Sequence, residues 1–130
     1  MAWEIEYYER ADGWQPAESY EDDMSTRYPK LYGKLLACLE AIAEHGQRLG
    51  GGYIETCRNY AGLWEARAIF NGFLARELLG FDGQRVVLLH GYTKRVGEVA
   101  SQGDLQRAHD FWGDYQRTRR ISPEEEEDNE

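Results

Sequence analysis

The sequence predicts an α+β domain in which a mostly antiparallel sheet packs against a helical hairpin. Apolar residues recur at helical spacing in the first half of the chain and again near its end, whereas much of the second half alternates with a period of two. Asn71-Gly72 and Asp82-Gly83 separate three of the alternating runs, and such dipeptides between apolar runs favour tight hairpins. The expected order of elements along the chain is β-α-α-β-β-β-α.

One strand and two helices are expected in the first half. Residues 3–9 begin with alternating apolar and polar side chains, which is typical of a strand. Residues 16–28 start with a proline followed by acidic residues, which the helix dipole favours there, so they are predicted to form a short helix. Residues 30–48 are predicted to form a second helix that ends at Gly46 and the glycines after it. The two helices are expected to pack as an antiparallel hairpin.

The second half is expected to supply a three-stranded meander and a closing helix. The strands are predicted at residues 62–70, 73–81 and 85–92. The closing helix is predicted at residues 104–119, with Asp104 as its N-terminal cap. Residues 121–130 carry six acidic groups and no basic ones. Residues 1–120 are therefore expected to form one domain, followed by an acidic disordered tail.

Charge is distributed unevenly along this chain of 130 residues, whose net charge is −9. Residues 58–95 carry six basic and three acidic groups, so an acidic protein contains a locally basic stretch. Candidates for RNA binding within it are Arg58, Arg85 and Arg95. No apolar run reaches the length of a membrane helix and no secretion signal is evident, so a cytoplasmic protein without membrane contact is expected. Cys38 and Cys57 are expected to be reduced thiols.

Several chemically useful side chains are expected on one face of the meander. With a period of two, Glu65 and Arg67 share a face of its first strand, and Arg76 lies within its second. The third strand is expected to carry on one face Val86, Leu88, His90 and Tyr92. Because one face of the sheet must cover the helices, the other face can gather functional side chains. Those expected there are Arg67, Arg76, His90, Tyr92 and Lys94.

Such a cluster suits metal-independent cleavage of RNA. The reaction builds negative charge around phosphorus, which fixed cations stabilise more in the transition state than in the ground state. RNA supplies the 2′-hydroxyl as nucleophile, so the protein needs a base, an acid and cations, and neither a metal nor a cofactor. Arg67 and Arg76 can hold phosphate oxygens. His90 can act as base or acid, and Glu65 is a second candidate base. Tyr92 can stack on a nucleobase or help to move a proton.

Each of these residues also has a structural interpretation. Arg67 can pair with Glu65 or Glu77 rather than with phosphate. His90 can serve packing, and Tyr92 can belong to the core. The spacing by itself therefore favours a basic sheet face more strongly than it favours a nuclease.

Four short segments resemble elements of the RelE/HigB toxin superfamily, especially its phage-derived branch. Gly62–Arg67 resembles the element GLxELR, and Arg76 resembles the arginine of the YR element in the next strand. Val87–Arg95 is similar to the segment LLHGFxKK, and Leu105–Ala108 resembles the EIxxA start of the closing helix. Each motif is short, but their order and spacing agree over residues 3–117.

The resemblance implies a RelE-like fold and a toxin that cuts translated mRNA at the ribosome. It also implies a cognate antitoxin, which often carries a helix-turn-helix domain. Carried over by position, Arg67 and Arg76 would hold and stabilise the phosphate. The active face would also be lined by His90, Tyr92, Lys94 and Arg95.

Two other functions stay open at the level of sequence. ParE-like proteins share this architecture and poison DNA gyrase, whereas a degenerate toxin or phage protein would keep the fold only for protein contacts. The acidic net charge favours the latter. Glu77 follows Arg76 where the family usually has an apolar residue. If its side chain points inward, it needs a partner or a raised pKa.

Overall fold

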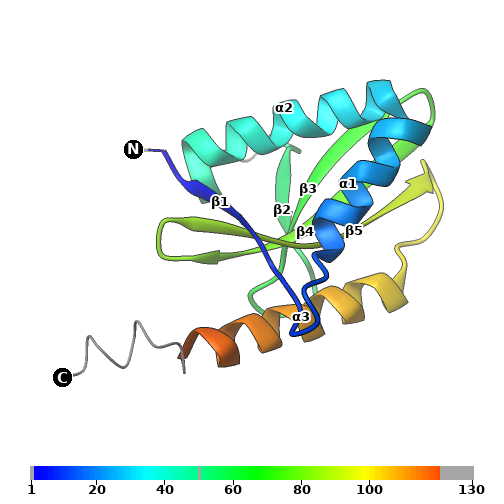
Figure 1. The fold of residues 1–130 in the computed structure, drawn as a ribbon. Coiled ribbons are helices and arrows are strands. Elements are labelled where there is room, and N and C mark those ends of the chain that lie inside the picture. The colour runs from blue at the N-terminus through cyan, green and yellow to red at the C-terminus, as the bar shows by residue number, and fades with distance from the viewer. Residues whose placement is uncertain (1, 50, 121–130) are drawn as a thin grey trace.

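Five strands form one sheet in the order β1-β5-β4-β3-β2, in a computed structural model that describes residues 2–49 and 51–120 (Figure 1). The strands are β1 (Glu4–Tyr7), β2 (Ile54–Thr56), β3 (Trp64–Phe70), β4 (Phe73–Asp82) and β5 (Arg85–Arg95). β1 runs parallel to β5, and the other neighbouring pairs are antiparallel. The α+β class and the mostly antiparallel sheet are confirmed, whereas the predicted acidic tail lies outside the described residues.

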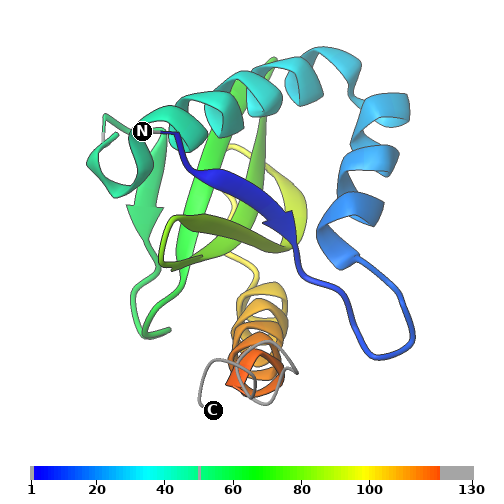
Figure 2. The ribbon, with the colours of Figure 1, turned by 60° about the vertical axis from the view of Figure 1, so that its left-hand side comes forward.

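Helices cover both faces of the sheet. They are α1 (Pro16–Arg27), α2 (Pro29–His45) and α3 (Gln102–Arg120), with a short 3-10 helix, η1 (Gly46–Arg48), after α2. α1 and α2 pack on one face and α3 on the other, so the sheet is the middle layer (Figures 1 and 2). The core beneath α1 and α2 includes Met24, Leu35, Ile42 and Leu88. The core beneath α3 includes Leu63, Leu78, Ala108 and Trp112. Within the described ranges, no helix has the length and apolarity to cross a membrane.

α1 and α2 are joined through a single residue, Tyr28. Both helices begin with proline, whose missing amide costs no helical hydrogen bond in a first turn. The two helices form a V that opens away from Tyr28 (Figure 2). The prediction of an antiparallel pair is therefore wrong. One linking residue is shorter than the loops of about two to five residues that let helices reverse direction.

β2 is not among the elements predicted from the sequence. Its three residues pair with the start of β3, from Ile54 opposite Ala66 to Thr56 opposite Trp64. Three residues are too few to show a hydrophobic period. β2 therefore depends on its pairing with β3 rather than on a pattern of its own.

A β-bulge in β5 changes which side chains share a face. Leu78 pairs with His90, and the next residue of β4 pairs with Leu88, so one residue of β5 is left over. Leu88 consequently lies in the core beneath α1 and α2, whereas Tyr92 lies in the core beneath α3. The prediction that all four residues share a face is wrong for Val86 and Leu88, because the alternation is offset by one at the bulge.

α3 begins two residues before its predicted start, and its cap is Ser101 rather than Asp104. The amide of Asp104 donates to Ser101 Oγ at 3.3 Å, and Ser101 Oγ donates to Asp104 Oδ2 at 2.6 Å. This arrangement satisfies one of the free amides of the first turn. Asp104 lies within that turn, which leaves its second carboxylate oxygen available to β5.

Glu77 points into the core beneath α1 and α2. Its side chain is fully buried, and Glu21 of α1 is buried as well. The Tyr7 hydroxyl donates to Glu21 at 2.8 Å. Burial, followed by the neighbouring Glu21 carboxyl, raises the pKa of Glu77 well above its ordinary value. The expectation that an inward Glu77 needs a raised pKa is confirmed, because burial disfavours the charged form of its carboxyl group.

Candidate active site

Arg67, Arg76 and Tyr92 form one row across three strands. Arg67 of β3 lies opposite Arg76 of β4, and Arg76 lies opposite Tyr92 of β5. Directly opposed residues of neighbouring strands present their side chains on the same face of a sheet. The guanidinium of Arg76 donates to the Tyr92 hydroxyl oxygen at 3.1 Å. The structure therefore brings these three predicted site residues together.

Glu65 lies between the two arginines. Its carboxylate oxygens are 3.4 Å from Nε of Arg76 and 3.9 Å from Nε of Arg67. Only 5 % of Glu65 is exposed. Burial raises the pKa of Glu65, although the guanidinium groups of Arg76 and Arg67 act in the opposite direction. A carboxylate with a raised pKa is a stronger base, so this environment suits Glu65 to accept a proton.

Glu55 of β2 gives Arg67 a second carboxylate partner, with 3.1 Å between Arg67 Nη1 and Glu55 Oε2. The two carboxylates balance the charges of Arg67 and Arg76. The cluster is consequently an ion-pair network and not an uncompensated basic patch. Of the two carboxylate partners that the sequence offers Arg67, Glu65 does pair with it. Glu77 does not, because it lies on the other face of the sheet.

Both arginines keep an unused hydrogen-bond donor. Their Nε–H groups are buried and have no hydrogen-bond partner within residues 2–49 and 51–120. The ion pairs with Glu65 are close enough for charge attraction, but their geometry does not satisfy these donors. An unsatisfied buried N–H costs free energy, and an acceptor from outside can reach these two donors only if the side chains around them move.

His90 lies on the same face but is held against α3. Its Nε2 is 2.7 Å from Asp104 Oδ1, and its ring meets Phe111 edge-on with 6.0 Å between ring centroids. Burial disfavours the charged form of Asp104, but hydrogen bonds from Ser101 and His90 outweigh it and lower the pKa of Asp104. His90 thereby fastens β5 to the first turn of α3.

Leu78 separates His90 from Glu65. Glu65, Leu78 and His90 occupy one cross-strand row, and Leu78 in its middle is completely buried. Neighbouring strands are about 4.8 Å apart, so the Cα atoms of Glu65 and His90 are roughly 10 Å from one another. His90 is therefore separated from Glu65, but it lies two residues before Tyr92 on the same face of β5 and so borders the cluster on that side.

The remaining cations near the row lie at its margin. Lys94 follows Tyr92 by two residues on the same face, and its Nζ donates to the carbonyl oxygen of Glu98. Arg95 is exposed and stacks over Phe73, 5.5 Å from the ring centroid. Arg58 is exposed in the loop between β2 and β3. Lys94 is the best placed of the three to meet a phosphate held by the row.

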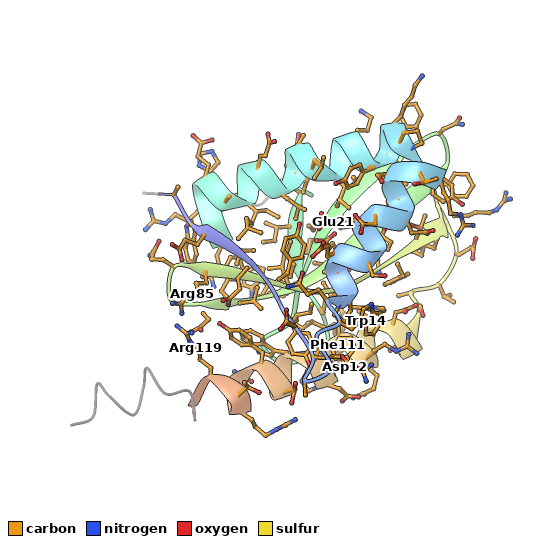
Figure 3. All side chains as sticks on the ribbon, in the orientation of Figure 1. Asp12, Trp14, Glu21, Arg85, Phe111 and Arg119 are labelled. Atoms are coloured by element: carbon orange, nitrogen blue, oxygen red, sulfur yellow. The ribbon has the colours of Figure 1, made fainter. Side chains whose placement is uncertain are left out.

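Arg85 lies at the far end of β5, away from the cluster. Asp82 is 3.7 Å from both Arg85 and Arg119, so this end of the sheet is joined to the end of α3 (Figure 3). At about 3.3 Å per residue, the seven steps from Arg85 to Tyr92 span roughly 23 Å. The structure therefore separates Arg85 from the other residues predicted to bind RNA.

The residues around the row do not favour catalysis by a cysteine thiolate or by a bound metal ion. Burial, followed by the charge of Glu65, raises the pKa of Cys57 to about 12, so this thiol stays protonated and is a poor nucleophile. Both cysteines are free. In the part of the chain that the structure describes, no three His, Cys, Asp or Glu side chains gather as possible metal ligands.

Two residues of this face escaped the sequence-based prediction. Glu55 lies on β2, the strand that has no pattern of its own, so nothing local indicates its pairing with Arg67. Asp104 was expected only as a helix cap. The Ser-x-x-Asp spacing of Ser101 and Asp104 is the available signal, because it resembles a capping box.

Comparisons with known proteins assign no family to this chain. No protein-family model matches it, and no curated protein matches it either. The fold and the site therefore define this protein only by its architecture and its side-chain cluster. It is an α+β chain with helices on both faces of a five-stranded sheet and an Arg-Glu-Arg-Tyr cluster on the face that α3 partly covers.

Proposed function

We propose that this chain is a RelE/HigB-type toxin that cuts translated mRNA at the ribosome without a metal ion. Its expected partner is a cognate antitoxin that restrains the activity. One observation carries the proposal: Glu65 is buried between Arg67 and Arg76. Arg76 in turn donates a hydrogen bond to the Tyr92 hydroxyl. This set contains a base, two cations and a hydroxyl group within a few ångströms of one another.

In this proposal Glu65 is the general base. It takes the proton from the 2′-hydroxyl while that oxygen attacks phosphorus. As Glu65 becomes neutral, Arg67 and Arg76 lose a carboxylate partner at the moment when negative charge builds on the phosphate oxygens. The arginines therefore stabilise the transition state more than the ground state, which is the condition for catalysis.

Tyr92 is assigned the role of general acid. Its hydroxyl oxygen accepts a hydrogen bond from Arg76, so its own proton is free to move to the 5′-oxygen as the bond from phosphorus to that oxygen breaks. The products are a 2′,3′-cyclic phosphate and a 5′-hydroxyl end. His90 is assigned a structural role, since Asp104 holds it against α3. This differs from the role that the sequence favours.

A protein-binding module is the second candidate function. The observation in its favour is that both arginines are already paired with carboxylates in a chain of net charge −9. Charged groups paired in this way attract nucleic acid less strongly than free ones. Under this alternative the chain would be harmless when expressed without a partner.

The test is induced expression in bacteria, followed by growth measurement and mapping of mRNA 5′ ends. Glu65→Gln and Glu55→Gln form a matched pair, because each removes one carboxylate partner of Arg67 but only Glu65 is buried in the row. We expect Glu65→Gln to lower cleavage by about 10²–10⁴-fold. Glu55→Gln should retain it.

Three outcomes would reject this proposal. Equal RNA cleavage by the wild type and Glu65→Gln would show that Glu65 is not the general base. Growth arrest with intact mRNA and damaged DNA would indicate a gyrase poison. Normal growth with accumulation of folded wild-type protein would indicate the binding module.

A further inference from the structure

The edge of the sheet at β3 is open over the second half of that strand. β2 pairs only with Trp64–Ala66, and Gly51-Gly52, with φ of 64° and 84°, turns the chain before β2 begins. The amide of Arg67 still donates to the carbonyl of Tyr53 at 3.1 Å. Alternate residues of a strand direct their amides to the same edge, so the Ile69 amide points there too. No backbone partner for it occurs within residues 2–49 and 51–120.

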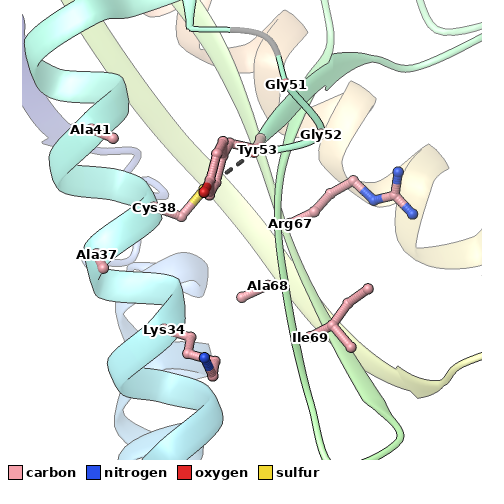
Figure 4. Close-up of a pocket in the computed structure, with 10 residues that line it drawn as sticks. All are labelled: Lys34, Ala37, Cys38, Ala41, Gly51, Gly52, Tyr53, Arg67, Ala68 and Ile69. Atoms are coloured by element: carbon pink, nitrogen blue, oxygen red, sulfur yellow. Dashed lines mark hydrogen bonds between the residues drawn. The ribbon is translucent and has the colours of Figure 1, made fainter.

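A groove of about 640 Å³ runs along this open edge, between β3 and α2 (Figure 4). Small side chains keep it open, namely Ala37 and Ala41 of α2 and Ala68 of β3. Tyr53 stands at one end with 54 % of its surface exposed. The groove follows the line that a longer β2 would take. An extended chain placed there would continue the sheet at the usual strand spacing of about 4.8 Å.

Two lysines give this groove a positive end. Nζ of Lys30 and Nζ of Lys34 lie 5.9 Å and 5.8 Å from the ring centroid of Phe70. Neither lysine forms an ion pair within the part of the chain that the structure describes. None of the residues that line the groove is acidic. On a protein of net charge −9, this combination selects a ligand with carboxylates.

An apolar hollow of about 360 Å³ continues beyond the lysines. It is lined by Tyr28 and Leu31 on the helical side and by Phe70 and Phe73 on the hairpin. Aromatic walls of this kind bind an apolar side chain and exclude water around it. The edge, the groove and the hollow thus offer backbone pairing, a charged contact and an apolar anchor along one line.

We propose that this edge binds an extended segment of a partner protein that carries carboxylate and apolar side chains. The segment continues the line of β2 and pairs with the backbone of Ile69, which is recognition by strand addition. Its carboxylates meet Lys30 and Lys34, and one apolar side chain enters the hollow beside Phe70. The proposal does not rest on RNA cleavage, because the binding requires neither RNA nor Glu65.

The test is selection from a displayed library of random peptides on the full chain, followed by measurement of the Kd of a synthetic copy of the enriched peptide. We expect enriched peptides to contain acidic and apolar residues. Methylation of the peptide nitrogen that pairs with Ile69, and Ile69→Pro in the protein, should each weaken binding about tenfold or more. Ile69→Pro leaves the ladder with β4 intact, because the Ile69 amide faces the open edge.

Charge reversal provides the second arm and its control. Lys30→Glu with Lys34→Glu should weaken the peptide about tenfold or more. Arg48→Glu, an exposed substitution after α2, should not. Failure to enrich any peptide, or unchanged binding by the double variant and by the methylated peptide, would overturn the proposal. A further test adds single-stranded RNA to the bound peptide. The proposal would be overturned if the RNA displaced the peptide and also bound the Ile69→Pro variant and the double variant as tightly as the wild type, because the peptide would then occupy an RNA site elsewhere on the protein.

Discussion

Nε2 of His90 lies 2.7 Å from Oδ1 of Asp104, and this contact connects β5 to the first turn of α3. We expect His90→Ala to lower the free energy of unfolding by about 1–3 kcal/mol, because it leaves a partly buried carboxylate with one partner fewer. Urea unfolding measures this change. A double-mutant cycle with Asp104→Ala should give a coupling energy of about 0.5–3 kcal/mol, and additive effects would contradict the contact.

The same contact predicts how stability responds to acid. The pKa of Asp104 is lowered in the folded protein from its ordinary value of 3.8. Its contribution is therefore fully present above that value and is lost as the pH falls through the lower folded pKa. Asp104→Asn should make stability less sensitive to pH in this acidic range. An unchanged dependence would mean that Asp104 is not held in the charged form.

Glu77 predicts the opposite behaviour at higher pH. Because its folded pKa is raised above the ordinary 4.5, its contribution is fully present below pH 4.5 and is lost as the pH rises through the folded pKa. Between pH 4.5 and the folded pKa, stability should fall by up to about 1.4 kcal/mol per pH unit, and it should level off above the folded pKa. Glu77→Gln, which cannot ionise, should be more stable than the wild type at mildly alkaline pH. Thermal unfolding over a pH series measures the difference.

Glu18 provides the control for that series. It lies on α1 like Glu21, but its side chain is exposed. Glu18→Gln should follow the wild-type stability at each alkaline pH. If both variants behaved alike, the buried carboxyl would not be the cause.

Replacing glycine by alanine is expected to have opposite effects on stability at two positions. A Cβ atom at Gly91 would lie 2.1 Å from the Tyr20 ring, whereas a Cβ atom at Gly33 of α2 would meet nothing within 4 Å. We expect Gly91→Ala to destabilise the protein by about 1–3 kcal/mol, because α1 must move away from β5. Gly33→Ala should stabilise it by about 0.5–1 kcal/mol, since alanine favours an exposed helical position. Urea unfolding of both variants tests the packing of α1.

The hydrogen bond from Arg76 to Tyr92 makes a prediction about activity. If Tyr92 is the acid, Tyr92→Phe should lower RNA cleavage by about 10²–10⁴-fold without unfolding the chain. Tyr53→Phe, at an exposed tyrosine outside the row, should leave the rate unchanged. In the wild type the rate should rise with pH through the raised pKa of Glu65, because the base must be ionised. A rate independent of pH over that range would argue against Glu65.

Much of the site could be anticipated from short-range pattern. Alternation within β3 and β4 predicts that Glu65, Arg67 and Arg76 share a face, and the structure agrees. The face of Tyr92 is also correct, although Val86 and Leu88 were assigned to it wrongly. The bulge that separates them is a feature of the pairing between β4 and β5, and no residue within β5 marks it.

The sequence by itself determined the α+β class, the three meander strands and the positions of the helices. Each of these depends on residues a few positions apart, whose periodicity and turn dipeptides act locally. Only the tertiary structure decided that β2 forms, that Glu55 pairs with Arg67 and Glu65 with Arg76, and that His90 meets Asp104. Those contacts join elements distant along the chain, so their geometry exists only after the sheet has assembled and both faces have been covered.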